Sequence, residues 1–394
     1  MKSKTIINER RKVWRVIVSS IRGAFPFSKK SELVAFNKFA GKFSWQFPGI
    51  NKSDTDFFLF LERFFARFGN SHSKLNKYPT KKFYLPKGYQ VAQNGDNFYL
   101  IRKGNFLGKI ILIDGLSPRA LLRYHYSRVT GPTRHFRISQ SLKFILSSYI
   151  KQPAHILINT KIGNKLITVT RHRAGKNQKN IKPITIYKYK NDVIYIRIIS
   201  WRKEVINNNQ IEEAINKVAR LRGRAIIIDL RGNGGGSQPR AAYFAGHFFS
   251  TTVPVGISER RLSENSLKTK KSFYYFTRRH PFLNLPVIIL INSQCMSASE
   301  LFISGMLDNQ RVMLIGESTA GGSGSPRMFS TTYGRKKVSY QISTWRFYRR
   351  TGQPIEGMGI KPHIIVKPKL EDIKSGKDVV LERALKEAKK LAKI

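Results

Sequence analysis

Ser297 lies where an apolar run ends and a helical pattern begins. Residues 286–292 are rich in Val and Ile and predict a buried strand. After a small, polar turn at residues 293–298, apolar residues recur at helical spacing from Ser299 to Asn309. A serine at such a turn can stand clear of the sheet as a nucleophile, facing the helix N-terminus. The alternative is that Ser297 or Ser299 caps the helix, and this stretch alone favours capping.

A second stretch combines a buried strand with three consecutive glycines. Ala225–Asp229 predicts the strand, and residues 230–237 have the sequence LRGNGGGS. A dinucleotide site fits badly, because a GxGxxG motif begun at Gly232 would need glycine where Ser237 stands, and no GxxxxGK[ST] occurs. Glycines leave backbone N–H groups free to face a ligand. The loop therefore suits an oxyanion hole for acyl transfer.

Four motifs follow one another along the chain: DLRGNGGG at 229–236, SASE at 297–300, GESTAGG at 316–322 and EGMGIKP at 356–362. Together they resemble the serine peptidases related to the tail-specific (C-terminal processing) proteases and the tricorn protease core. The resemblance is strong from about residue 193 to residue 362. It implies that Ser297 is the nucleophile and that the N–H groups of Gly236 and Ala298 form the oxyanion hole. Asp308 also matches an acidic position of the tail-specific branch, for which the resemblance implies a structural role.

One departure from the tail-specific branch concerns the general base. That branch carries a lysine in a segment of the form GxxTxGKG, and here Gly322 occupies the lysine position. The tricorn branch instead uses a histidine supported by serine and glutamate, with its Ser-His pair just before a PDZ-like domain. This chain has NSHS at residues 70–73 in the corresponding place, and Glu356 aligns with the glutamate. The resemblance therefore implies a site of Ser297, His72, Ser71 and Glu356.

These residue types form a coherent acyl-transfer site. Serine is a weak nucleophile at neutral pH and needs an adjacent base, which neutral imidazole can supply. A partner on the other ring nitrogen fixes the tautomer, as in other triads, and Ser71 backed by Glu356 could do so. Without the resemblance, a loop histidine bonded to backbone would be the preferred reading of His72.

Composition sets the class of protein. The chain has 394 residues, 41% hydrophobic and 12% aromatic, which predicts two or three globular domains with a real core. The formal net charge is +49, and residues 115–191 contain no Asp or Glu. Such a charge attracts acidic polypeptides, nucleic acid or anionic membranes. No nucleic-acid motif is present and the basic residues are spread over the whole chain, so the sequence argues against a specific nucleic-acid site.

The cysteine and histidine residues and the lengths of the apolar segments bear on disulfides, metal sites and membrane segments. The single cysteine, Cys295, excludes an intramolecular disulfide and is expected to be a small buried residue beside the turn. No HExxH or comparable spacing occurs, so neither a metal nor another cofactor is expected. The N-terminus is basic, and Arg15 and Arg22 interrupt its apolar part, which argues against a secretory signal. No run has the length of a transmembrane helix, and a cytoplasmic location is the default, with periplasm or secretion left open.

Four regions are expected in an α/β (α+β core) protein. Residues 1–78 form an N-terminal helical module carrying Ser71 and His72, with an amphipathic helix at Asp54–Phe68. Residues 79–175 form a degenerate PDZ-like domain of short strands, with residues 76–82 as a linker. Residues 176–370 form the peptidase core, which resembles a ClpP/crotonase-like βαβ fold and has exposed basic residues 251–285 as a hairpin or lid. Residues 371–394 form an amphipathic C-terminal helix.

The sequence thus predicts a serine endopeptidase that works through an acyl-enzyme on Ser297 with His72 as general base. Its expected partner is a polypeptide substrate, acidic or unfolded in character, while the oligomeric state stays open. The first alternative is a catalytically inactive peptidase-fold protein that binds peptides or acidic partners, motivated by the missing lysine. A weaker alternative is charge-driven binding of an anionic polymer.

Overall fold

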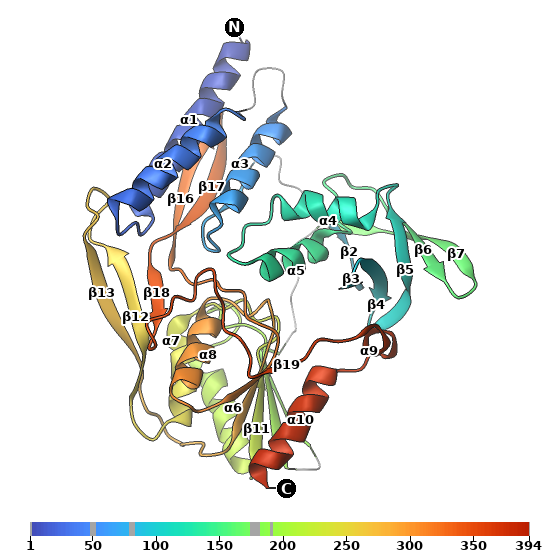
Figure 1. Ribbon diagram of the computed structural model, residues 1–394, viewed down its shortest axis with the longest axis vertical. Coiled ribbons are helices and arrows are strands. Elements are labelled where there is room, and N and C mark those ends of the chain that lie inside the picture. The colour runs from blue at the N-terminus through green and yellow to red at the C-terminus, as the bar shows by residue number, and fades with distance from the viewer. Residues whose placement is uncertain (1, 48–52, 79–82, 174–181, 190–191, 394) are drawn as a thin grey trace.

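A six-stranded sheet carries the loops on which the predicted nucleophile and oxyanion hole lie. The computed structural model describes residues 2–47, 53–78, 83–173, 182–189 and 192–393 (Figure 1). The strands of this sheet are β9 (Ile184–Lys188), β10 (Val193–Ile198), β11 (Ala225–Asp229), β14 (Val287–Ile291), β15 (Met313–Gly316) and β19 (Ile364–Ile365). Their order is β19-β15-β14-β11-β10-β9. Strand β9 is antiparallel to β10, and the other neighbouring pairs are parallel.

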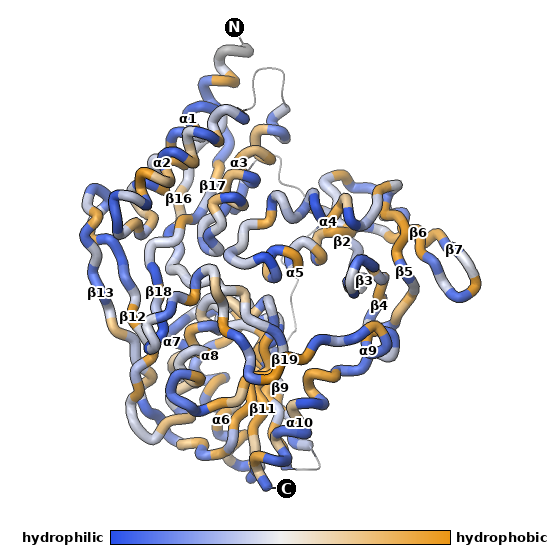
Figure 2. The backbone as a smooth tube through the Cα atoms, in the orientation of Figure 1, coloured by the Kyte–Doolittle hydropathy of each residue, from blue (hydrophilic) through white to orange (hydrophobic). Residues whose placement is uncertain are grey.

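Both faces of this sheet are buried. Ile194 and Ile196 of β10 pack toward a cluster that includes α6 (Asn208–Arg220), α7 (Gln238–Ala245) and α8 (Ala298–Asp308). Val193 and Tyr195 point to the opposite face, which α10 (Val379–Ala392) covers. Strands buried on two faces need apolar residues at every position. This requirement explains the apolar runs at residues 225–228 of β11 and throughout β14. The apolar colour of β11 is visible in the core in Figure 2.

A smaller antiparallel sheet extends from the core. Its strands are β12 (Val253–Arg261), β13 (Thr269–Phe276) and β18 (Arg346–Arg349), in the order β13-β12-β18. Strands β12 and β13 form the hairpin predicted within residues 251–285. A short 3-10 helix, η1 (Gly246–Phe248), ends the segment that begins with α7.

The N-terminal helices share a core with a hairpin from late in the chain. Helices α1 (Lys2–Ala24), α2 (Lys30–Ser44) and α3 (Asp54–Phe68) pack with strands β16 (Pro326–Tyr333) and β17 (Lys336–Ser343) in one apolar cluster (Figure 1). Strand β1 (Lys74–Lys77) follows α3 and pairs antiparallel with β17. The chain just before β1 is therefore tied to the C-terminal third of the sequence.

The helix at Asp54–Phe68 was predicted with its correct bounds. Ser53 begins it, since its hydroxyl accepts a hydrogen bond from the N–H of Asp56 at 3.1 Å. Gly69 ends it in the left-handed conformation, with φ of 76°. Helices α1 and α2 were not predicted individually. The predicted linker at 76–82 is wrong at its start, because Asn76 and Lys77 belong to β1, and residues 79–82 lie outside the described residues.

The middle of the chain forms a separate antiparallel sheet. Its strand order is β3-β4-β5-β6-β7, and β2 pairs with β8 beside it. The elements of this region are β2 (Tyr84–Pro86), β3 (Tyr89–Asn94), β4 (Asn97–Arg102), β5 (Asn105–Ile113), α4 (Pro118–Tyr126), α5 (Arg134–Phe144), β6 (Ala154–Thr160), β7 (Gly163–Val169) and β8 (Arg171–Arg173). The short helix α9 (Leu370–Ser375) contacts β5. The PDZ-like character of this region stays a prediction.

Among the described residues, no helix combines the length and the apolar character that a bilayer span requires. In the same part of the chain, no group of three or more His, Cys, Asp or Glu side chains is arranged to hold a metal ion.

Candidate active site

Ser297 occupies a strained backbone position at the start of α8. Its φ of 61° and ψ of −122° are unusual for a residue with a side chain, and such strain clusters at functional sites. Its N–H donates to the carbonyl of Gly322 at 2.9 Å and to Glu300 Oε2 at 3.1 Å. Its hydroxyl makes no capping hydrogen bond to the helix. The geometry therefore corresponds to a nucleophile elbow rather than to the helix cap considered from the sequence.

The imidazole of His72 lies against this serine. The distance from His72 Nε2 to Ser297 Oγ is 3.1 Å, across a sequence separation of 225 residues. The pairing of β1 with β17 brings the two together, because it fixes the loop that follows α3. Two further hydrogen bonds attach the loop to β17. Gln341 Nε2 donates to the carbonyl of His72 at 3.1 Å, and Ser73 Oγ accepts from the N–H of Ser343 at 3.0 Å.

Ser71 and Glu356 extend the chain of contacts on the other side of the imidazole. Ser71 Oγ lies 2.8 Å from His72 Nδ1 and donates to Glu356 Oε2 at 3.1 Å. Since the Ser71 hydroxyl donates to the carboxylate, its oxygen is left to accept a hydrogen bond from the N–H group at Nδ1. The imidazole then presents an unprotonated Nε2 to Ser297, which is the tautomer that a general base requires.

The sequence did not identify all the groups that hold Glu356. Asn70 Nδ2 donates to Oε1 at 3.1 Å, the N–H of Ser71 donates to Oε1 at 3.0 Å, and the N–H of Ser323 donates to Oε2 at 2.7 Å. Asn70 also accepts the N–H of His72 at 3.1 Å, so it orients both members of the chain. Asn70 could have been noticed inside NSHS, whereas a backbone donor such as Ser323 leaves no signal in the sequence.

Burial sets the protonation of this chain of residues. Desolvation, with a contribution from the charge of Lys74, lowers the pKa of His72 to about 3, so the imidazole is neutral near pH 7. Desolvation raises the pKa of Glu356 to about 7, although the hydrogen bonds from Ser71 and Ser323 oppose this shift. Near neutral pH, the group of this chain that changes its protonation is therefore the carboxyl group of Glu356.

We expect the Glu356→Gln variant to lose the pH dependence of activity around pH 7. In the unmodified protein, kcat/KM should rise as the pH increases through about 7, where Glu356 ionises. Only the ionised carboxylate is purely an acceptor for the hydrogen bond from the Ser71 hydroxyl, since a protonated carboxyl group would itself be a donor. The variant should be about a hundredfold slower at pH 8, at the lower end of the range that general-base catalysis contributes. Its profile from pH 6 to 8 should be flat, since His72 is already neutral. A rise of equal size in both profiles would contradict the assignment.

The glycine loop, which contains the predicted oxyanion donor Gly236, lies against the elbow. The backbone of Gly235 passes so close to the elbow that a Cβ there would stand 2.9 Å from the nitrogen of Ala298. Trp201 holds the loop, since its N–H donates to the Gly235 carbonyl at 3.0 Å and its indole Nε1 donates to Ser299 Oγ at 3.1 Å. Within the described residues, the N–H groups of Gly236 and Ala298 donate no hydrogen bond. They are available to a negative oxygen.

Glu300 is a buried carboxyl group to which the sequence assigned no role. It accepts from the N–H groups of Gly321 at 2.7 Å and Gly322 at 2.8 Å, besides the N–H of Ser297 and the hydroxyl of Thr319. Desolvation raises its pKa to about 8, against these hydrogen bonds. It thereby fixes the segment 319–322 against the elbow. The last letter of SASE was the signal for this residue.

The space beside Gly322 explains why the lysine of the tail-specific branch is missing. A Cβ on Gly322 would stand 2.7 Å from Ser71 Oγ and 2.9 Å from Met296 Cγ. Real Cβ contacts are essentially never shorter than 3.0 Å, so a side chain at position 322 cannot coexist with Ser71 in its present place. The glycine and the Ser-His pair therefore depend on each other.

We expect Gly322→Ala to reduce kcat by about a hundredfold with little change in KM. The added methyl displaces Ser71, and a small misplacement near the reacting groups costs rate of this order. The control is Gly41→Ala on α2, where nothing lies within 4 Å of the added carbon. Steady-state kinetics check the effect, and thermal unfolding checks that the variant is folded. Full activity of Gly322→Ala would show that Ser71 is not required in this position.

Two residues for which the sequence predicted a structural role have structural surroundings. Cys295 is fully buried, its Sγ lies 3.0 Å from the carbonyl of Leu230, and burial raises the pKa of the thiol to about 12, so it is no nucleophile. Asp308 lies at the far end of α8 and pairs with Arg349 of β18. This ion pair joins the helix to the smaller sheet.

Comparisons with known proteins bear on the family of the peptidase core. Residues 192–366 match the model of peptidase family S41. The carboxy-terminal-processing protease of Bartonella bacilliformis is 24% identical over 226 residues, which are 55% of this chain and 50% of that protein. The chain thus spans about half the length of this curated relative.

Solved structures match over nearly the whole chain. The structure of mature CPAF has a TM-score of 0.79 and 14% identity, and covers 99% of this chain and 98% of that one. The tricorn protease has a TM-score of 0.51 and 15% identity, with 98% of this chain and 37% of that one covered. At these identities the likeness shows the fold, and the α/β class predicted from the sequence is confirmed. The match of residues 192–366 to peptidase family S41 agrees with the resemblance that the motifs of this region show.

Proposed function

We propose that this protein is a serine peptidase that cleaves polypeptides through an acyl-enzyme on Ser297. The observation that carries the proposal is the continuous chain of contacts from Glu356 through Ser71 and His72 to Ser297. Its relatives include a protein named as a carboxy-terminal-processing protease, which supports a peptide substrate. Nothing in the site favours the inactive alternative.

In the proposed reaction, each catalytic group acts once during acylation and once during deacylation. Ser297 Oγ attacks the peptide carbonyl carbon while its proton passes to His72 Nε2. The N–H groups of Gly236 and Ala298 hold the carbonyl oxygen as it becomes negative. The imidazolium then returns the proton to the leaving amine as the C–N bond breaks. A water molecule repeats the sequence on the acyl-enzyme, and the carboxylic acid leaves.

The net charge of the chain bears on which substrates are favoured. A pocket of about 10 Å³ next to Ser297, lined by Leu301, Trp345, Phe347 and Ile355 together with polar residues, holds no more than about one water molecule and therefore selects no substrate side chain. The net charge of +49 favours acidic polypeptides by steering them to the surface, and an unfolded segment can enter the site without prior unfolding.

Covalent labelling with a fluorophosphonate tests the proposal. We expect the folded protein to gain one phosphonyl group on Ser297, with loss of fluoride, because only an activated serine displaces it. Tryptic peptides and mass spectrometry locate the label, and protein denatured before exposure serves as the control. Absence of labelling in folded protein, or a label on another serine, would favour the inactive peptide-binding alternative.

A further inference from the structure

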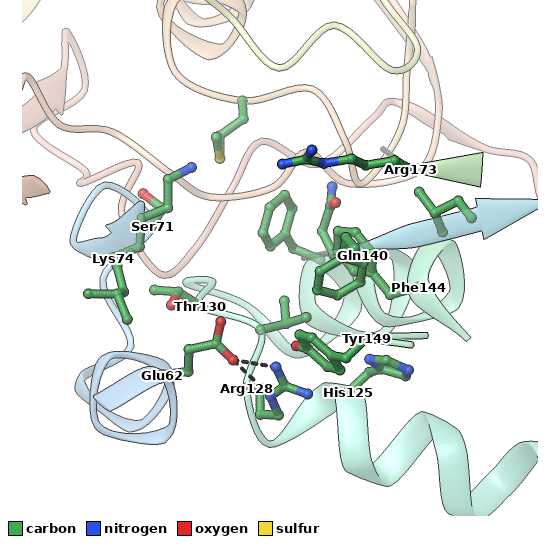
Figure 3. A pocket seen from close by; sticks show the side chains of 16 residues that line it. Glu62, Ser71, Lys74, His125, Arg128, Thr130, Gln140, Phe144, Tyr149 and Arg173 are labelled. Atoms are coloured by element: carbon green, nitrogen blue, oxygen red, sulfur yellow. Dashed lines mark hydrogen bonds and ion pairs between the residues drawn. The ribbon is translucent and has the colours of Figure 1, made fainter. Parts of the chain in front are cut away.

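Helix α5 of the middle region borders two cavities at its boundary with the core. The first has a volume of about 530 Å³, and Figure 3 shows Ser71 of the catalytic chain and Gln140 of α5 on different sides of it. The second has a volume of about 540 Å³ and is lined by His135 of α5 and Glu317 of the core, among others. The cavities interrupt the packing of α5 on the core along two faces of the helix, so hydrogen bonds contribute much of the connection between them.

Two hydrogen bonds join the start of α5 to the segment 319–322, which lies between β15 and β16. Thr133 Oγ1 donates to the carbonyl of Ala320 at 2.7 Å, and His135 Nε2 lies 2.7 Å from the carbonyl of Thr319. A carbonyl oxygen only accepts, so Nε2 carries the hydrogen of this imidazole. Both donors belong to the middle region, whereas both acceptors belong to the core.

These bonds satisfy carbonyl groups that the fold has buried. The two residues that carry these carbonyls are fully buried, and a buried carbonyl without a donor costs free energy. The next two carbonyls receive their hydrogen bonds from the core: the N–H of Gly357 donates to Gly321 at 2.8 Å, and the N–H of Ser297 donates to Gly322 at 2.9 Å. The core thus holds the second half of the segment, and the middle region holds the first half.

The end of this segment contacts the catalytic groups. The carbonyl of Gly322 holds the N–H of Ser297, and the missing side chain at Gly322 leaves the space that Ser71 occupies. The next residue, Ser323, donates its N–H to Glu356 Oε2 at 2.7 Å. A displacement of the segment therefore moves the nucleophile relative to the groups that activate it, and a misplacement of about 1 Å can cost about a hundredfold in rate.

We propose that Thr133 and His135 are positioning residues for the reaction at Ser297. They hold the first two carbonyls of the segment 319–322, and through this segment they hold the elbow in register with its base. The proposal rests on the proposed function. Both side chains act through the segment and not on the substrate.

Two pairs of variants separate the hydrogen bonds from packing. Thr133→Val keeps the shape of the side chain and removes the donor, whereas Thr133→Ser keeps the donor and removes a methyl group. His135→Leu removes the ring donor, and His135→Gln supplies an amide donor in its place. We expect Thr133→Val and His135→Leu each to lower kcat about tenfold with little change in KM. Thr133→Ser and His135→Gln should stay close to the unmodified protein.

Ser117→Ala is the matched control for the loss of a helix cap. Thr133 Oγ1 also accepts the N–H of Phe136 at 3.4 Å at the start of α5, and Ser117 Oγ accepts the N–H of Ala120 at 3.2 Å at the start of α4. A purely structural role would lower the unfolding temperature of Thr133→Val and Ser117→Ala alike and leave kcat unchanged in both. We expect Thr133→Val to lower kcat and Ser117→Ala to retain it.

Hydrogen exchange provides a measurement that needs no activity. The N–H groups of Gly321 and Gly322 donate to the buried Glu300, so they should exchange slowly in the unmodified protein. We expect faster exchange in the two variants that lack a donor at position 133 or 135. Mass spectrometry of peptides that span residues 317–324 measures it.

The combination of kinetics and exchange separates this proposal from the proposed function. If the unmodified protein cleaves peptides, an unchanged kcat in both Thr133→Val and His135→Leu would overturn the proposal and retain the peptidase function. If the unmodified protein neither cleaves peptides nor reacts with a fluorophosphonate, the peptidase function is rejected. Faster exchange in the variants would then retain the holding contacts, and unchanged exchange would overturn them as well.

Discussion

Replacing Ser297 by alanine is expected to lower kcat/KM by about four to six orders of magnitude. The hydroxyl oxygen is the atom that forms the acyl-enzyme, and removing a serine nucleophile in comparable sites leaves only the contribution of the oxyanion hole and binding. Peptide hydrolysis, measured at substrate concentrations far below KM, checks the change. Turnover equal to that of the unmodified protein would reject Ser297 as the nucleophile.

The Ser297→Ala variant should remain folded. Alanine has to adopt the same φ of 61°, so the backbone strain is unchanged, and only the contact between Ser297 Oγ and His72 is lost. Ser304→Ala is the matched control on the same helix, where the hydroxyl donates to the carbonyl of Leu301 at 3.0 Å. We expect that control to keep its activity and the thermal unfolding of both variants to occur at a temperature close to that of the parent protein.

Replacing His72 by alanine is expected to lower kcat by about three to five orders of magnitude, with a small effect on KM. Without the imidazole, Ser297 has no base within hydrogen-bond distance, because Gly322 stands where a lysine would be needed. The measurement is single-turnover acylation followed by steady-state kinetics. His155→Ala is the control, since His155 lies on β6 in the middle region with an exposed side chain.

The His72→Ala variant also tests the order of the chain of contacts. Because Ser71 and Glu356 act through the imidazole, Glu356→Gln added to His72→Ala should cause little further loss. A further loss as large as that in the parent background would mean that Glu356 acts on the substrate directly.

Local patterns were sufficient to predict the elements that carry the nucleophile. Strand β11 was predicted with its correct bounds, because a strand buried on both faces admits few polar residues. The elbow was predicted from the change of period between β14 and α8. The individual helices before Asp54 were not predicted, since their apolar residues face the hairpin β16–β17, a partner absent from the local sequence.

The candidate site needed two kinds of information. The motifs nominated Ser297, His72, Ser71 and Glu356, and in the structure they form one chain of contacts. No local pattern could indicate that the N–H of Ser323 holds the carboxylate, because backbone donors are independent of residue type. The cavity lined by Glu62, Ser71, Arg128 and Met296 also leaves no signal in the local sequence, because its walls come from segments far apart in the chain.

The sequence by itself determined the residue types of an acyl-transfer site, the apolar strands that support them and the absence of the family lysine at Gly322. Only the tertiary structure decided that the loop at residues 70–73 reaches the elbow. The pairing of β1 with β17 does this, and it joins residues separated by more than two hundred positions. The physical reason is that hydrogen-bonded strand pairing and the packing of α3 on the hairpin act between distant segments, where residue spacing carries no information about distance.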